Sequence, residues 1–178
     1  RNMNVKLKFL KVKSVPKLFW SSPSASTVLP PLISVFILIL GLFLFGLGEA
    51  LLISSGIGVS PWTVFAQGVK NITGWSIGFA TFIISIFVMI LWVPLRQMPG
   101  FGTIMNIIII ALVLDLVLPF LPKFNHLSLK IAEGLIGVII TGLGGALYLI
   151  ANLGPGPRDG LMTGMQKVTN FPIAWVRS

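Results

Sequence analysis

The sequence predicts an all-α membrane protein, a polytopic helical bundle built from two inverted three-helix repeats. Three observations predict it: the scarcity of charge, four long apolar windows, and a register in which the chain matches itself. Of the 178 residues, 10% are charged and 55% are hydrophobic, and the mean hydropathy is +0.98. Soluble domains carry about 25% charged residues, so this composition excludes a water-soluble domain.

Four apolar windows each approach the ~20 residues that an α-helix needs to cross a bilayer. They cover residues 31–54, 76–95, 101–121 and 131–152. A soluble core of this size cannot hide four such runs, so each window is expected to be a crossing. The first window is longer than the roughly 7–15 residues of a signal-peptide core, and it is expected to stay in the mature protein.

The chain begins with a basic tail and linker, residues 1–29. Six of the thirteen basic residues lie there, namely Arg1, Lys6, Lys8, Lys11, Lys13 and Lys17. No aromatic platform or RNA-binding motif accompanies them, so nucleic acid is not expected as a partner. Their clustering favours a cytoplasmic N-terminus that contacts anionic lipids, because basic residues are enriched on the cytoplasmic side.

The chain matches itself when it is shifted by 96 residues, so that Pro61 meets Pro157. Eleven identities then fall between residues 41–77 and residues 137–173. The strict offset persists through a polar loop, which favours an internal repeat over a chance likeness of two glycine-rich helices.

The first repeat is predicted to span residues 30–122 and to contain three crossings. Because three is odd, the second repeat, residues 123–178, begins on the opposite side of the membrane, and the repeats are inverted, as in many secondary transporters. The register also predicts that the second repeat is truncated, and that roughly 40 further residues with two more apolar runs would complete it.

A Gly-x-x-Pro turn follows the glycine-rich helix of each repeat and precedes a short helix, predicted at residues 61–71 and 157–169. At about 1.5 Å per residue such a helix reaches only about half of the bilayer core, so it re-enters the membrane or lies at its surface. Ser60 is a good N-cap before Pro61, and Gly156 holds the equivalent place. Their unpaired N–H groups favour either one shared anion site or two interfacial turns without a ligand.

Three of the four acids lie inside predicted crossings, with Glu49 deep in the first, Asp115 late in the third and Glu133 near the start of the fourth. An ionised Glu49 or Asp115 side chain would cost free energy inside the hydrocarbon core, so both residues are candidates for proton coupling. Glu49 is expected to be neutral at neutral pH. The structural alternative is a hydrogen-bonded neutral side chain for Glu49 and an exposed helix-end acid for Asp115. Glu133 is expected to lie near a helix start and to stabilise it as a cap.

Arg158 and Asp159 are the most distinctive polar pair. Arg158 is expected to hold an anionic group with Asp159 fixing its guanidinium, unless the two residues simply pair with other loops. The other predicted substrate-binding residues are Ser60, Pro61, Trp62, Gln67 and Gly156. The amides of Gln67, Asn71 and Asn106 are expected to line a polar path or to join helices. Close helix packing is expected at Gly41, Gly46, Gly48, Gly142, Gly144 and Gly145.

Five short motifs stand out from about residue 40 to the C-terminus. They are Gly58-Val-Ser-Pro-Trp62, Gln67-Gly68, Gly74-Trp-Ser-Ile-Gly78, Pro99-Gly-Phe-Gly-Thr103 with Asn106, and Gly154-Pro-Gly-Pro-Arg-Asp159. As a set they resemble the YczE/YitT-like family of uncharacterised bacterial integral membrane proteins. The resemblance implies a multi-pass protein of the bacterial inner membrane and brings no substrate with it. The first turn of such proteins often reads Pro-Trp-Asp, whereas Thr63 follows Trp62 here, so an acid role belongs to Asp159.

These features predict a secondary transporter or exporter of a small solute, with an anionic solute favoured. The alternative is a non-transporting membrane scaffold or a regulator of another complex. Catalysis is not expected, because His126 is the single histidine and no HExxH, Gly-x-Ser-x-Gly or Walker motif occurs. The chain has no cysteine, which excludes thiolate metal sites, and no cofactor is expected. The oligomeric state stays open.

Overall fold

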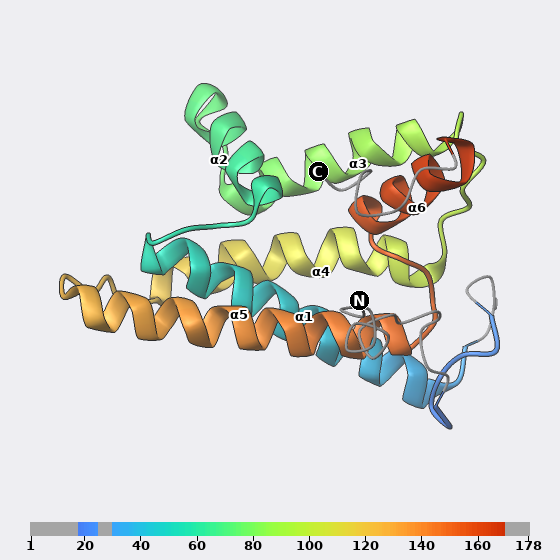
Figure 1. The fold of residues 1–178 in the computed structure, drawn as a ribbon, viewed down its shortest axis with the longest axis horizontal. Coiled ribbons are helices and arrows are strands. Elements are labelled where there is room, and N and C mark those ends of the chain that lie inside the picture. Colours follow the sequence, from blue (N-terminus) through green and yellow to red (C-terminus); the bar gives the residue numbers. More distant parts are fainter. Residues whose placement is uncertain (1–17, 25–29, 170–178) are drawn as a thin grey trace, which may run out of the picture.

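The computed structural model describes residues 18–24 and 30–169, and every regular element within those ranges is helical (Figure 1). The elements are α1 (Leu32–Ser55), α2 (Pro61–Thr73), α3 (Ile77–Trp92), α4 (Phe101–Val117), the 3₁₀ turn η2 (Leu118–Phe120), α5 (Leu127–Ile150) and α6 (Pro157–Thr169). This confirms the all-α prediction. The tail before residue 18 and the crossing expected from residue 172 onward lie outside the described residues.

Within the described ranges, three helices are long and apolar enough to cross a membrane, and they are α1, α4 continued by η2, and α5. These residues hold a fourth crossing only if α2 and α3, which are bent by 113° at a short break, form one broken span. The predicted crossing at residues 76–95 is therefore too long, since α3 has 16 residues. Its end has a physical cause: Pro94 lacks a backbone N–H, so it cannot donate the next helical hydrogen bond.

The two longest helices, α1 and α5, run antiparallel and touch backbone to backbone (Figure 1). A Cβ atom added to Gly41 would lie 3.0 Å from the carbonyl oxygen of Gly144, and one added to Gly48 would lie 2.7 Å from that of Gly137. Glycine is required at these positions because any side chain would force the two helices apart.

The predicted glycine packing is confirmed at four positions and wrong at another. Gly41, Gly48 and Gly144 lie in the α1–α5 crossing, and Gly46 packs on Val113 of α4. A Cβ at Gly142, in contrast, would meet no atom within 4 Å, because this glycine faces a cavity instead of a helix.

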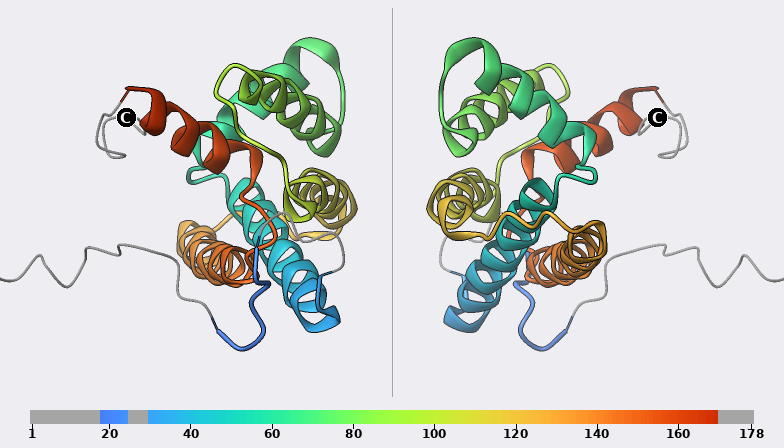
Figure 2. Two further views of the ribbon diagram at one scale, coloured as in Figure 1. Left: turned by 90° about the vertical axis from the view of Figure 1, so that its right-hand side faces the viewer. Right: turned by 90° about the vertical axis from the view of Figure 1, so that its left-hand side faces the viewer.

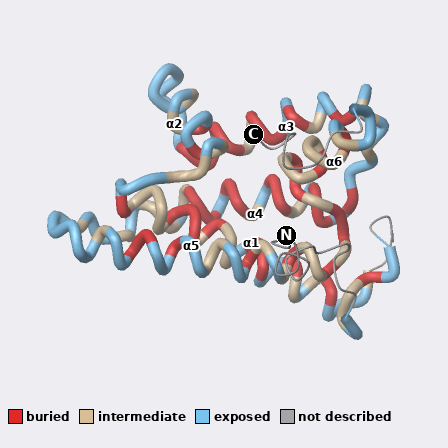
Figure 3. Tube along the Cα trace, in the orientation of Figure 1, coloured by how far each residue is buried: buried red, intermediate tan, exposed pale blue. Residues whose placement is uncertain are grey.

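A layer of shorter helices covers the other side of α4. In both views of Figure 2, α2, α3 and α6 lie on one side of α4, and α5 lies on the other. Trp92, which is 2% exposed, seals the α3–α6 contact against Gly160. The buried residues gather where α1, α3 and α4 face each other, whereas much of α5 is exposed on its outer side (Figure 3). Apolar side chains on that outer side suit contact with lipid.

Candidate functional site

The two proline turns meet at one cavity of about 800 Å³. The loops after α1 and α5 leave opposite ends of the bundle and turn back, so that α2 and α6 both begin near its middle (Figure 1). Residues of both turns line the cavity, namely Ser60, Trp62 and Thr63 from the first and Gly156, Arg158 and Asp159 from the second. One of the two arrangements predicted from the sequence is a site shared by the turns, and this cavity brings most of the predicted residues together.

At the first turn, a chain of hydrogen bonds joins the start of α2 to the carboxyl group of Glu49. Ser60 caps α2, since its Oγ accepts a hydrogen bond from the Thr63 backbone N–H at 3.3 Å. The hydroxyl oxygens of Ser60 and Thr63 lie 2.9 Å apart, and Thr63 Oγ1 donates to Glu49 Oε2 at 2.6 Å. Glu49 is 7% exposed and lines the cavity, so its carboxyl group is both bonded and positioned beside the proposed ligand space.

At the second turn, bonds from two helices, α3 and α4, fix the backbone. The indole Nε1 of Trp92 donates to the carbonyl oxygen of Pro157 at 3.0 Å, and Thr103 Oγ1 donates to that of Pro155 at 2.8 Å. The Gly102 N–H donates to the carbonyl oxygen of Leu153 at 2.6 Å. The motif around residues 99–103 therefore holds the turn at residues 153–157 in place.

Arg158 lies in the cavity wall, and its guanidinium has no partner among the described residues. Within the described ranges it makes neither an ion pair nor a side-chain hydrogen bond, although its charge acts on Glu49 and Tyr148. The expected fixing of Arg158 by Asp159 is absent from the described structure, because Asp159 accepts a hydrogen bond from the Tyr148 hydroxyl instead. Five donors in a planar fork are thus directed to whatever fills the cavity.

The remaining predicted site residues lie away from this cavity. Gln67 lines a different one, and Pro61 is exposed outside the cavity lining. Asp115 accepts hydrogen bonds from the Ser76 hydroxyl at 2.6 Å and from the Gly78 N–H at 2.8 Å. It therefore caps the start of α3 and is not the exposed helix-end acid of the alternative interpretation.

The cap expected at Glu133 is wrong. Helix α5 begins at Leu127, about one turn earlier than the apolar window suggested, so Glu133 lies inside the helix. Its side chain is 6% exposed, and neither carboxylate oxygen has a hydrogen-bond partner in the described part of the chain. The window missed the first turn because Lys130 and Ser128 lower its hydropathy.

Three further residues shape the site. Tyr148 was missed, although a single tyrosine within an apolar helix is a signal of a buried hydroxyl that needs a partner. Trp92 was also missed, whereas Asn106, expected on a polar path, does line the cavity beside Gly156. No group of three His, Asp or Glu side chains able to hold a metal occurs among the residues that the structure describes.

Comparison with known proteins supports the resemblance. Residues 32–178 match the family of unknown function DUF6198. An uncharacterised protein of Haemophilus influenzae is 41% identical over 168 residues, which cover 94% of this chain and 76% of that protein. The uncharacterised membrane protein YczE of Bacillus subtilis is 30% identical over 140 residues, which cover 78% of this chain and 65% of YczE. No solved structure matches.

Proposed function

This chain belongs to the DUF6198 family of uncharacterised bacterial membrane proteins, and we propose that it is a secondary transporter of a small solute with an anionic group. The observation that carries the proposal is Arg158, a cation in a membrane-protein cavity without an ion-pair partner among the described residues. Charge inside a membrane is costly, so an unpaired arginine there favours an anionic ligand that pairs with it.

The cavity wall supports recognition of a small molecule. Trp62, Tyr148 and Phe45 supply aromatic surface, while Glu49, Asn106 and Asp159 supply polar groups from other elements. Ligand sites commonly combine such apolar walls with a few directed polar groups. A volume of about 800 Å³ suits a metabolite and exceeds what a single inorganic ion needs.

The packing of α1 on α5 supports an inverted repeat. Under the shift of 96 residues, Gly41 corresponds to Gly137 and Gly48 to Gly144. The contacts are crossed, because Gly41 meets Gly144 and Gly48 meets Gly137. Crossed contacts between equivalent positions of antiparallel helices are what a two-fold axis between them produces. Such an axis in the membrane plane relates the halves of many transporters.

In this proposal the protein lies in the bacterial inner membrane with a cytoplasmic N-terminus, where the basic tail meets anionic lipids. Labelling of single cysteines tests the orientation, since the chain contains none. Ile57→Cys, after α1, should react from the periplasm, and Met98→Cys, between α3 and α4, should react from the cytoplasm. The reverse pattern would overturn the orientation.

The transport proposal is tested with purified protein in proteoliposomes. We expect a labelled set of mono- and dicarboxylates, together with a bacterial metabolite extract followed by mass spectrometry, to show movement of at least one anionic solute. Arg158→Ala should abolish that movement. The control is Lys167→Ala, which removes an exposed cation from the same helix, α6, outside the cavity, and transport should persist.

A folded protein that moves no solute from either source would overturn the transporter and favour the scaffold or regulator. Movement that is equal in Arg158→Ala and Lys167→Ala would remove Arg158 from the mechanism. Both variants are first compared with the parent by gel filtration and thermal melting, so that loss of fold is separated from loss of transport.

A further inference from the structure

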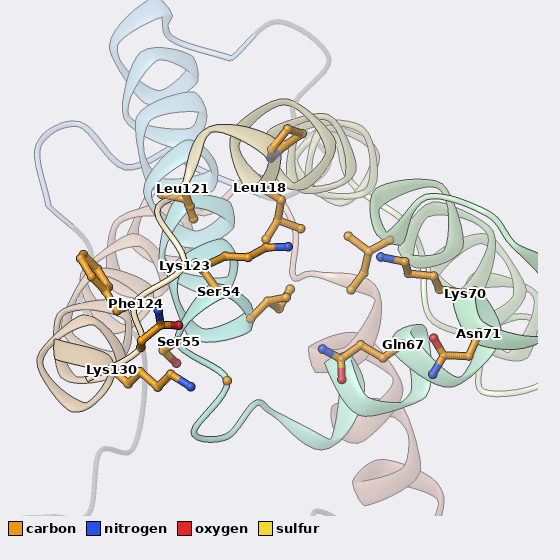
Figure 4. A pocket seen from close by; sticks show the side chains of 15 residues that line it. Ser54, Ser55, Gln67, Lys70, Asn71, Leu118, Leu121, Lys123, Phe124 and Lys130 are labelled. Carbon is orange, nitrogen blue, oxygen red and sulfur yellow. The ribbon is translucent and has the colours of Figure 1, made fainter. Parts of the chain in front are cut away.

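A second cavity, of about 670 Å³, lies at the end of the bundle where α1 finishes and α5 starts. The last residues of α1, the middle of α2, the η2 turn and the connection into α5 surround it (Figure 4). It shares no lining residue with the cavity between the proline turns. The transport proposal therefore leaves this second cavity without a role.

The charged groups on this second cavity are all positive. They are Lys70 from α2, Lys123 from the connection after η2, and Lys130 from α5. None of the four acids lines it, and none of the three lysines forms an ion pair with a described residue. In Figure 4, Lys70 and Lys123 extend toward each other from opposite sides of the opening. Three like charges around one space repel each other unless an anion lies between them.

The uncharged polar groups around the cavity add further donors. The side-chain amides of Gln67, Asn71 and Asn125 line it, and none of them is hydrogen-bonded to another residue in the described ranges. The nearby hydroxyls are already engaged, since Ser54 donates to the Pro122 carbonyl at 3.1 Å and Ser55 to that of Leu52 at 2.8 Å. Three ammonium groups and three free amides thus face one cavity, which suits an acceptor-rich ligand.

We infer that this cavity binds a phosphate-bearing anion, held by Lys70, Lys123 and Lys130 and hydrogen-bonded by the amides. A phosphate group offers several charged oxygens in a compact volume, and lysine binds it as a point charge without a fixed geometry. A lipid headgroup and a soluble phosphate compound present this same chemistry. The cavity opens at a bundle end, where helix termini meet the headgroup region, so either source can reach it.

The test uses the whole protein in nanodiscs of phosphatidylcholine, with radiolabelled pyrophosphate as the soluble probe in equilibrium dialysis. We expect saturable binding that weakens with added salt. The double variant Lys70→Gln/Lys123→Gln should weaken it by at least about tenfold. The charge-matched control Arg96→Gln/Lys167→Gln removes two exposed cations that line neither cavity, and binding should change less than about twofold.

A second arm distinguishes the two sources by repeating the dialysis in nanodiscs that contain phosphatidylglycerol. Displacement of pyrophosphate by this lipid supports a headgroup as the occupant, and undiminished binding supports a soluble anion. The inference is overturned if pyrophosphate does not bind saturably and spin-labelled phosphatidylglycerol is not immobilised more than phosphatidylcholine. Equal binding by the two double variants would overturn it as well. Gel filtration and melting temperature of both variants verify that each is folded.

Discussion

The two proline turns share a sequence motif but differ in how firmly the fold holds them. At the first turn Gly56, Ile57, Gly58 and Pro61 are exposed, whereas at the second Leu153, Gly154, Gly156, Pro157 and Gly160 are buried. The second turn receives hydrogen bonds from α3, α4 and α5, while the first is joined to α1 by the bond from Thr63 to Glu49. The two turns, although similar in sequence, therefore differ in burial and in the number of hydrogen bonds that hold them.

One kind of hydrogen bond nevertheless occurs at both turns, with the hydroxyl and the carboxyl group exchanged between the two helices. Thr63 and Asp159 correspond under the shift of 96 residues, and each bonds to the long helix that precedes it. At the first turn the short helix supplies the hydroxyl and α1 supplies the carboxyl of Glu49. At the second turn the short helix supplies the carboxyl and α5 supplies the hydroxyl of Tyr148. The difference teaches that a hydroxyl–carboxyl pair, rather than a particular residue, joins each short helix to its long one.

The largest difference between the turns should appear at Gly160 and its counterpart Val64. A Cβ added to Gly160 would lie 2.0 Å from the Trp92 ring, so Gly160→Ala must displace that ring and break its bond to Pro157. We expect a loss of about 2–4 kcal/mol in the free energy of unfolding, measured by SDS titration in mixed micelles. Val64→Ala, at a side chain that is 55% exposed, should cost much less. Equal losses would show that the second turn is no more tightly packed than the first.

A smaller effect is expected when one anchoring hydroxyl is removed from each turn. Thr103→Val leaves the Gly100 N–H and the Pro155 carbonyl without their partner, and we expect a cost of about 1–3 kcal/mol. Ser60→Ala removes the cap of α2 and should cost about 1 kcal/mol. The same SDS titration ranks the two, and a larger cost at Ser60 would reverse the comparison.

A modest gain is expected from Gly68→Ala in α2. No atom lies within 4 Å of a Cβ placed there, and alanine favours the helix over glycine by about 1 kcal/mol. At the corresponding Gly164 of α6, a Cβ would lie 3.0 Å from Gln97 and 3.1 Å from Leu95. The rise in melting temperature should therefore be larger for Gly68→Ala than for Gly164→Ala. The opposite order would mean that α2 is packed more closely than its surroundings indicate.

The smallest effect on stability, and a large one on activity, is expected for Glu49→Gln. The amide oxygen can still accept the hydrogen bond from Thr63, so the free energy of unfolding should change by less than about 0.5 kcal/mol. If a neutral Glu49 delivers a proton during transport, glutamine removes that step. Solute movement in proteoliposomes should then lose its dependence on a pH gradient, and an unchanged dependence would exclude Glu49 as the proton carrier.

Much of the fold was predictable because long apolar runs and proline–glycine turns act locally. The bounds of α1 and α6 and the cap at Ser60 follow from such local signals. The convergence of the turns on one cavity was predicted only as one of two options, because the sequence of a turn does not specify the direction in which the following helix runs. The cap at Glu133 was wrong because this residue lies deeper in α5 than its window implied. The bonds from the start of α3 to Asp115 depend on a distant partner that the sequence does not reveal. Gly142 was misjudged for the same reason, because the sequence does not tell which face of a helix has a neighbour.

The glycine crossing of α1 and α5 has a mechanical consequence. Two backbones in direct contact leave no layer of side chains in which one helix could roll or slide, so the pair behaves as a single stiff frame. That frame carries Glu49 and Tyr148, whereas Thr63 and Asp159 belong to the short helices that begin at the cavity. The two hydroxyl–carboxyl bonds therefore connect this stiff pair of helices to the starts of α2 and α6. Loss of the Thr63–Glu49 bond would free the start of α2 from this frame, whereas the start of α6 would still be held by Trp92 and Thr103.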